Sequence, residues 1–145
     1  MRDLKQIIMQ LNKVLAIVCL GSLLVCNACQ RETKDERIKR EYEQFTLKEC
    51  PKDMNFCTRM DSICYDIDTR TLTEYYTLKD TLDDESILTD ELLNGFRDEI
   101  LKQLKTSLQM KPYKDEGINF RYDYRSFTTG KLLFELYYTK EEYGN

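Results

Sequence analysis

Two runs near the end of the chain alternate between apolar and polar residues, and this period of two constrains the fold more than any other feature. Such alternation is typical of strands with one buried face. The two runs therefore predict an antiparallel hairpin with one apolar and one polar face. Its apolar residues are Ile118, Phe120, Tyr122 and Tyr124, then Leu132, Phe134, Leu136 and Tyr138.

The turn of this hairpin must keep both apolar rows on one face, so paired residue numbers must sum to an even value. A loop at 128–130, with its glycine in the left-handed conformation, meets this condition and sets Asp123 opposite Glu135, which is unfavourable. A loop at 127–129 also meets it and sets Arg121 opposite Glu135. The sequence therefore predicts that paired residue numbers sum to an even value, and it leaves the choice between the two registers open.

An apolar residue recurs every four positions between residues 88 and 108, which predicts an amphipathic helix. Pro112 ends the pattern. We expect Leu92, Phe96, Ile100 and Leu104 to pack on the apolar rows of the hairpin. The stripe consists of Leu88, Leu92, Phe96, Ile100, Leu104 and Leu108.

Before this helix, residues 63–67 and 72–78 alternate like the two final strands and are joined by a short turn. The order is thus strand, strand, helix, strand, strand. It predicts an α+β fold: an antiparallel sheet of about four strands with one amphipathic helix packed on one face.

The first 29 residues have the organisation of a secretory signal. A basic start is followed by an apolar run from Val14 to Val25, and Ala28 directly precedes Cys29. The apolar run is too short to cross a hydrocarbon core, which needs about 20 residues. In this part the chain resembles bacterial lipoprotein precursors, in which the cysteine after the signal carries diacylglycerol and becomes the first residue of the mature protein.

The resemblance implies a signal peptide at 1–28, lipidation of Cys29 and attachment to a bacterial membrane, with the outer membrane as the expected location. The charged string at 34–36 resembles the export tag of Bacteroidota lipoproteins, although an ordinary solvated tether explains it equally well. We expect residues 29–48 to be a charged tether, either a stalk or a loosely docked helix, and 49–145 to form one small domain.

Three cysteines remain after Cys29, and an oxidising envelope allows one disulfide among them. The turn-rich segment 51–55 favours a disulfide between Cys50 and Cys57, whereas Cys64 falls in a predicted strand. The chain contains no histidine, and this spacing lacks the close pairs of a zinc site, so no metal is expected.

Composition excludes several classes of function. The formal net charge of −4 argues against a nucleic-acid partner, and neither a Gly-rich phosphate loop nor a nucleophile elbow occurs. Carboxylates remain the only enzyme-like groups. Asp66 and Asp68 share a strand face, and Glu74 interrupts an apolar row, as either a buried acid with a raised pKa or a solvated acid at a strand edge.

These observations predict a lipid-anchored accessory or binding protein of the bacterial envelope, with an envelope protein as partner and without catalytic activity or cofactor. The alternatives are a cystatin-like inhibitor, by analogy of layout alone, and an envelope enzyme that uses carboxylates. The candidate contact surface is the polar face of the final hairpin: Asn119, Arg121, Arg125, Glu135 and Tyr137.

Overall fold

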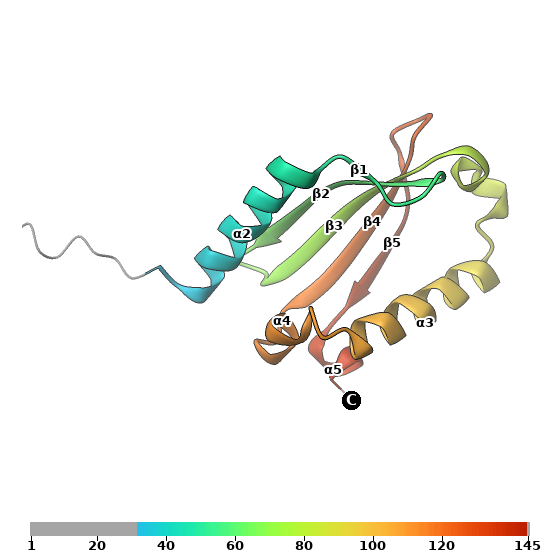
Figure 1. The fold of residues 1–145 in the computed structure, drawn as a ribbon. Helices are drawn as coiled ribbons and strands as arrows, with labels where there is room; N and C mark the ends of the chain where they lie inside the picture. The colour runs from blue at the N-terminus through green and yellow to red at the C-terminus, as the bar shows by residue number, and fades with distance from the viewer. Residues whose placement is uncertain (1–31, 145) are drawn as a thin grey trace, which may run out of the picture. The chain divides into compact units, whose positions relative to one another are not determined.

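The computed structural model describes residues 32–144, and Figure 1 shows a central sheet with helices along its edges in this view. The predicted signal peptide and Cys29, the predicted lipidation site, lie outside the described residues. Two short 3-10 turns, Asp80–Asp83 and Glu85–Ile87, follow the third strand. The other elements are α2 (Lys34–Glu49), β1 (Lys52–Asp53), β2 (Thr58–Asp66), β3 (Thr71–Leu78), α3 (Asp90–Thr106), α4 (Lys111–Asp115), β4 (Asn119–Ser126), β5 (Leu132–Tyr138) and α5 (Lys140–Tyr143).

The five strands form one sheet in the order β1-β2-β3-β4-β5. β3 and β4 are parallel, and the other neighbours are antiparallel. A parallel pair needs a crossover connection, which residues 79–118 supply with α3 and α4. The α+β class is confirmed, but the expectation that all of the strands are antiparallel is wrong. The sheet has five strands and is mixed, because the crossover returns the chain to the end of the sheet where β3 begins.

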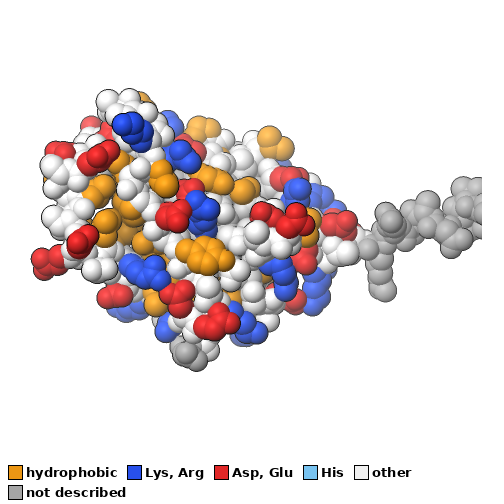
Figure 2. Space-filling model, turned by 180° about the vertical axis from the view of Figure 1, so that it is seen from behind, with side chains coloured by type: hydrophobic (Ala, Val, Ile, Leu, Met, Phe, Trp, Pro, Cys, Tyr) orange, Lys and Arg blue, Asp and Glu red, His pale blue; other side chains and the backbone are white. Residues whose placement is uncertain are grey.

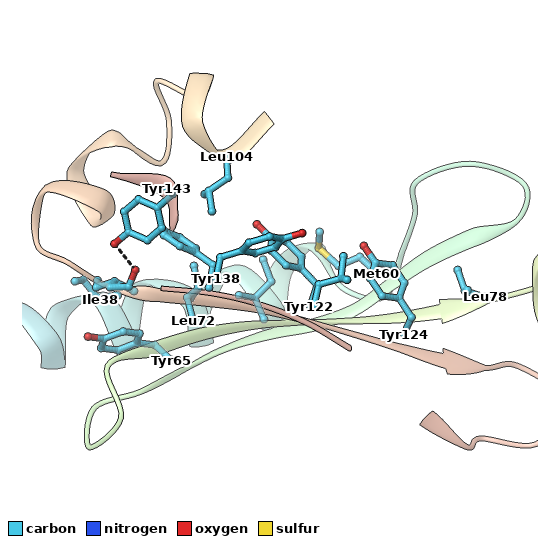
Figure 3. Close-up of a cluster of buried hydrophobic side chains, with 14 residues drawn as sticks. Ile38, Met60, Tyr65, Leu72, Leu78, Leu104, Tyr122, Tyr124, Tyr138 and Tyr143 are labelled. Carbon is cyan, nitrogen blue, oxygen red and sulfur yellow. Dashed lines mark hydrogen bonds between the residues drawn. The ribbon is translucent and has the colours of Figure 1, made fainter. Parts of the chain in front are cut away.

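The strand register sorts the side chains of the sheet into two faces. One face is apolar and is covered by helices, and Figure 3 shows its buried side chains. The other face is mainly polar. Three cross-strand rows make up most of the apolar face: Met60, Tyr76, Tyr124 and Phe134; Ile63, Glu74, Tyr122 and Leu136; Tyr65, Leu72, Phe120 and Tyr138.

Helix α2 belongs to the domain and covers the edge of β2 as well as the apolar face. The Thr46 hydroxyl accepts a hydrogen bond of 2.9 Å from the Ile63 N–H and donates one of 2.8 Å to the Ile63 carbonyl. β1 spans only two residues, so α2 satisfies backbone groups of β2 that β1 leaves unpaired. Ile38 of α2 is buried in the core. The predicted boundary at residue 49 therefore moves to Thr33, where the compact unit begins.

The charged residues 34–36 start this helix. The Glu36 carboxylate accepts a hydrogen bond of 2.7 Å from the Thr33 N–H, and the Thr33 hydroxyl accepts one of 3.2 Å from the Glu36 N–H, which forms a capping box. Lys34 forms an ion pair with Glu116, and Asp35 accepts a hydrogen bond from a tyrosine of β2. Each residue of the string that resembles an export tag thus has a structural contact.

The predicted apolar stripe faces the sheet at Phe96 and Leu104, but the prediction that Leu92 packs there is wrong. Phe96 contacts Tyr124 and Phe134 edge to face, with ring centroids 5.4 and 5.9 Å apart, and Leu104 is buried. Leu92 is 47% exposed and Leu108 is 83% exposed. A residue every four positions drifts by about 40° per step on a helix with 3.6 residues per turn, so Leu92 lies about 120° from Leu104 around α3 and leaves the packed face. Leu108 lies beyond the end of α3.

The final hairpin adopts the register set by the first predicted loop. Tyr124 pairs with Phe134, and Asp123 pairs with Glu135. The loop itself is longer than predicted, because the Ser126 N–H bonds to the Lys131 carbonyl and the pairing shifts by one residue between Tyr124 and Arg125. This irregularity keeps the two apolar rows on one face. Gly130 has φ +70°, the left-handed conformation predicted for it.

The three described cysteines are free thiols, so the predicted Cys50–Cys57 disulfide is not formed in the structure. β1 pairs Lys52 with Met60, and this register does not set Cys50 opposite Cys57. Instead, Cys57 is buried with its sulfur 3.9 Å from the Thr81 hydroxyl, and Cys50 packs against the core. No helix in residues 32–144 has the length and apolar character to cross a membrane.

Two leucines of α3 provide a matched test of this packing. Leu104→Ala should lower the free energy of unfolding by about 2–5 kcal/mol, because Leu104 is 2% exposed. Leu92→Ala should change it far less, by about 0.5 kcal/mol, because about half of Leu92 remains exposed to water. Urea unfolding followed by circular dichroism measures both. Equal losses in the two variants would contradict the helix orientation.

Candidate functional site

The contact surface predicted from sequence lies on the face of the sheet away from the helices. The register puts Arg121 in one row with Thr73 and Tyr137, and Arg125 in another with Thr77. The five predicted residues therefore share one face, as expected. Figure 2 shows the side of the molecule opposite to that of Figure 1, with acidic and basic side chains scattered among uncharged ones.

Much of the charge on this polar face is paired within the molecule. Arg121 donates hydrogen bonds of 2.7 Å to both Asp123 and Glu135, so one guanidinium lies between two acids that the register sets opposite each other. The bond to Asp123 raises the pKa of Arg121 above its ordinary value. Asp123 is buried. Arg121 thus offsets the unfavourable acid pair and offers little free charge to a partner.

A groove of about 690 Å³ lies on the other face of the sheet, between α2 and α3. α2 lines it with Glu41, Tyr42 and Phe45, and α3 lines it with residues that include Gln103 and Leu104. Figure 3 shows Tyr122 and Tyr124 on the side of the sheet that faces Leu104. This volume lies in the usual range of ligand sites. The floor consists of Met60, Ile63, Glu74, Tyr76, Tyr122 and Tyr124.

Glu74 is the one acidic side chain on the floor of the groove. It is 7% exposed, and its carboxylate accepts a hydrogen bond from the Tyr76 hydroxyl. No lysine or arginine within residues 32–144 forms an ion pair with it. Burial raises the pKa of Glu74, and the Tyr76 hydrogen bond opposes this rise. The sequence left Glu74 as either a buried acid or a solvated acid at a strand edge. The structure supports the buried acid.

The other acids considered for catalysis do not converge on Glu74. Asp66 lies at the end of β2 on the polar face and accepts hydrogen bonds from the N–H groups of Asp68 and Thr69. These bonds lower the pKa of Asp66. Glu41 lines the groove but is exposed on α2. The carboxylates therefore give no indication of a paired acid and base.

Tyrosines surround the buried acid. The rings of Tyr76 and Tyr124 are stacked with centroids 5.1 Å apart, and Tyr122 lies next to Glu74 across the parallel pair. Burial raises the pKa of Tyr42, Tyr76, Tyr122 and Tyr124 far above the ordinary value, so these hydroxyls stay protonated. The groove offers aromatic surface, hydroxyl groups and one buried carboxyl. Among the described residues, no cluster of metal ligands occurs.

Sequence reasoning missed the groove but pointed to the residue at its centre. The interruption of an apolar strand row by Glu74 was the available signal. The groove needs α2 on the same face as α3, and the narrow apolar stripe of α2 did not reveal that placement.

The raised pKa of Glu74 predicts how stability depends on pH. Between the ordinary value of 4.5 and the raised pKa, the folded protein binds more protons than the unfolded chain. The contribution of Glu74 to the unfolding free energy is therefore fully present below about pH 4.5 and is lost as the pH rises through the raised pKa. Relative to wild type, Glu74→Gln should gain stability over this interval, measured by urea unfolding between about pH 4 and pH 8.

Tyr76→Phe is the companion variant. It removes the hydrogen bond that lowers the pKa of Glu74, so the stability loss should extend to higher pH than in wild type. A wild-type minus Glu74→Gln difference that stays constant with pH would show that Glu74 is not a buried acid of raised pKa.

The fold has counterparts among solved structures. A candidate secreted protein from Pseudomonas aeruginosa superposes with a TM-score of 0.60 at 9% identity, covering 75% of this chain and 95% of that one. The type II secretion system pilotin AspS from Vibrio cholerae has a TM-score of 0.53 at 14% identity, covering 74% of this chain and 90% of the pilotin. Similarity at these identities concerns the fold alone.

Comparison with curated protein sequences gave no match. A family defined as a domain of unknown function, DUF8479, matches residues 33–134. This match begins at the residue that caps α2 and extends into β5, so it includes both helices of the groove and the floor between them. The chain therefore belongs to the DUF8479 family.

Proposed function

We propose that this protein is a lipid-anchored binding protein of the bacterial envelope that holds a partner protein in the groove between α2 and α3. The observation that carries the proposal is the groove itself, which has an apolar, tyrosine-rich floor and one buried acid. The signal-like N-terminal sequence and Cys29 support the anchor and an outer-membrane location. An anchor raises the effective concentration of a small domain near partners in the same membrane.

The surroundings of the groove support a macromolecular partner. Met54 lines the groove and is 51% exposed. The largely exposed Leu108 lies in the chain between Ser107 and Gln109, which also line it. Exposed apolar side chains beside a concave apolar surface mark sites of protein association. The two similar structures are, by name, a secretion-system pilotin and a candidate secreted protein, which is consistent with a role in the envelope.

The alternatives from sequence have less support. The cystatin-like inhibitor rested on one helix packed on an antiparallel sheet, whereas this sheet is mixed and two helices, α2 and α3, flank the groove on its apolar face. A carboxylate enzyme would need a second acid close to Glu74. Asp66 lies on the opposite face of the sheet, and Glu41 lines the groove from an exposed position on α2. We propose a binding role without catalysis.

The lipid anchor is tested by metabolic labelling with an alkyne analogue of palmitate in a bacterial host. The wild-type protein should be labelled and recovered in the membrane fraction. Cys29→Ser should lose the label, because the acceptor thiol is gone. Cys26→Ser is the matched control and should keep it. Label retained by Cys29→Ser, or lost only from Cys26→Ser, would contradict the assignment of Cys29 as the lipidated residue.

The binding face is tested by photo-crosslinking in cells. A photoreactive amino acid in place of Gln103, which is exposed on the wall of the groove, should crosslink to an envelope protein. The same amino acid in place of Arg125, exposed on the polar face, should not. Crosslinks from position 125 alone would move the contact to the polar face predicted from sequence. Crosslinks from neither position would contradict a stable partner at either face.

A further inference from the structure

Resting on the proposed function, we infer the chemistry of the partner: the segment that occupies the groove is apolar and carries one lysine or arginine whose charged end binds Glu74. The stem of that side chain packs on the tyrosines of the floor. The inference commits to a protein side chain as the source of the cation.

The charge of the groove gives the sign of its partner. The charged residues that line it are Glu41 and Glu74, and no lysine or arginine is among the lining residues. An anionic or carboxylate-bearing ligand would meet repulsion and find no cation to bind. A cationic group would meet only favourable charges.

Glu74 has unused capacity for hydrogen bonds. A carboxylate offers two oxygens with about four acceptor positions, and the Tyr76 hydroxyl is the hydrogen-bond donor that the structure provides to Glu74. Burial of an acid without a cation is costly, and a leucine in this row would complete an apolar core. A cation delivered by a partner would supply the missing charge and donors at a site where water is largely excluded.

The same protein already uses this chemistry elsewhere on the apolar face. The Arg97 guanidinium lies 5.0 Å from the ring centroid of Tyr138 and donates a hydrogen bond of 2.6 Å to Glu142. Tyr138 lies on β5 in the row next to that of Glu74. A cation held between a tyrosine ring and a glutamate is therefore compatible with this surface, and the floor around Glu74 offers both groups without the cation.

The floor also suits the stem of a long basic side chain. Tyr76 and Tyr124 present stacked rings beside Glu74, and Met60 lies in their row. Lysine and arginine bury their methylene stems along apolar surface while the charged end reaches a polar group. Methionine adapts its shape to the bound chain. The groove can thus bind both parts of such a side chain at once.

Peptide selection tests the inference. The probe is a library of random twelve-residue peptides displayed on phage, and the target is the full-length protein purified from membranes and held in lipid nanodiscs. Empty nanodiscs remove peptides that bind lipid. We expect the selected peptides to share an apolar segment with one lysine or arginine. Replacing that residue by glutamine should weaken binding by about ten- to hundredfold, as expected for a charged hydrogen bond.

Three variants of the protein test whether the basic residue of the peptide binds Glu74 in the groove. Glu74→Gln should weaken the same peptides by a similar factor, and combining it with the glutamine peptide should add little more. Gln103→Trp, which fills the groove from an exposed position on its wall, should abolish binding. Glu135→Gln on the polar face is the control and should leave affinity unchanged. Circular dichroism checks that each variant is folded.

The outcomes separate the inference from the proposed function. Peptides that need an open groove but lack a basic residue, or that bind Glu74→Gln as tightly as wild type, would overturn the inference and leave the groove as the binding site. Peptides unaffected by Gln103→Trp, or a selection that yields no peptide, would overturn the groove as the binding site.

Discussion

The parallel pairing of β3 with β4 is the constraint on which the rest of the structure depends. It requires the chain to leave the end of β3 and return to the opposite end of the sheet, and α3 spans that return. Both strands of the pair have a neighbour on each side, and their residues are mostly buried on both faces. The polar face therefore has small buried threonines on β3, Thr71, Thr73 and Thr77, between longer side chains of the neighbouring strands.

The groove follows from the way the two long helices meet this sheet. α2 is fixed at the β2 edge by the hydrogen bonds of Thr46 to Ile63, whereas α3 rests on aromatic rings through Phe96, Tyr124 and Phe134. A helix supported by rings stands farther from the sheet than one supported by small side chains. The same tyrosines that fill the core under α3 thus become the floor of the groove where neither helix covers them.

How much of this could be predicted from sequence depended on the range of the interactions. The even sum of paired residue numbers in the hairpin and the conformation of Gly130 follow from local alternation and turn geometry, and both agree with the structure. The choice between the two possible registers did not follow from the sequence. The parallel pairing of β3 with β4 cannot be predicted from the order strand, strand, helix, strand, strand, because the same order also describes an antiparallel sheet. The docking of α2 rests on a narrow stripe and on one threonine that bonds to a strand 17 residues away in the chain, a contact that periodicity does not encode.

The residues of the candidate site also differ in how far the sequence predicted their surroundings. This difference separates Arg121 on the polar face from Glu74 on the apolar face. Arg121 was expected to contact a partner, but its neighbours in the folded sheet, Asp123 and Glu135, already pair with it. Glu74 was visible as an acid in an apolar row, yet its environment depended on two helices that only the fold brings together. A side chain whose charge is paired within the molecule gains little from a partner, whereas a buried acid with one hydrogen-bond donor has much to gain. Under the proposed function, selectivity for a partner therefore resides on the apolar face, where folding leaves Glu74 without a cation among the described residues.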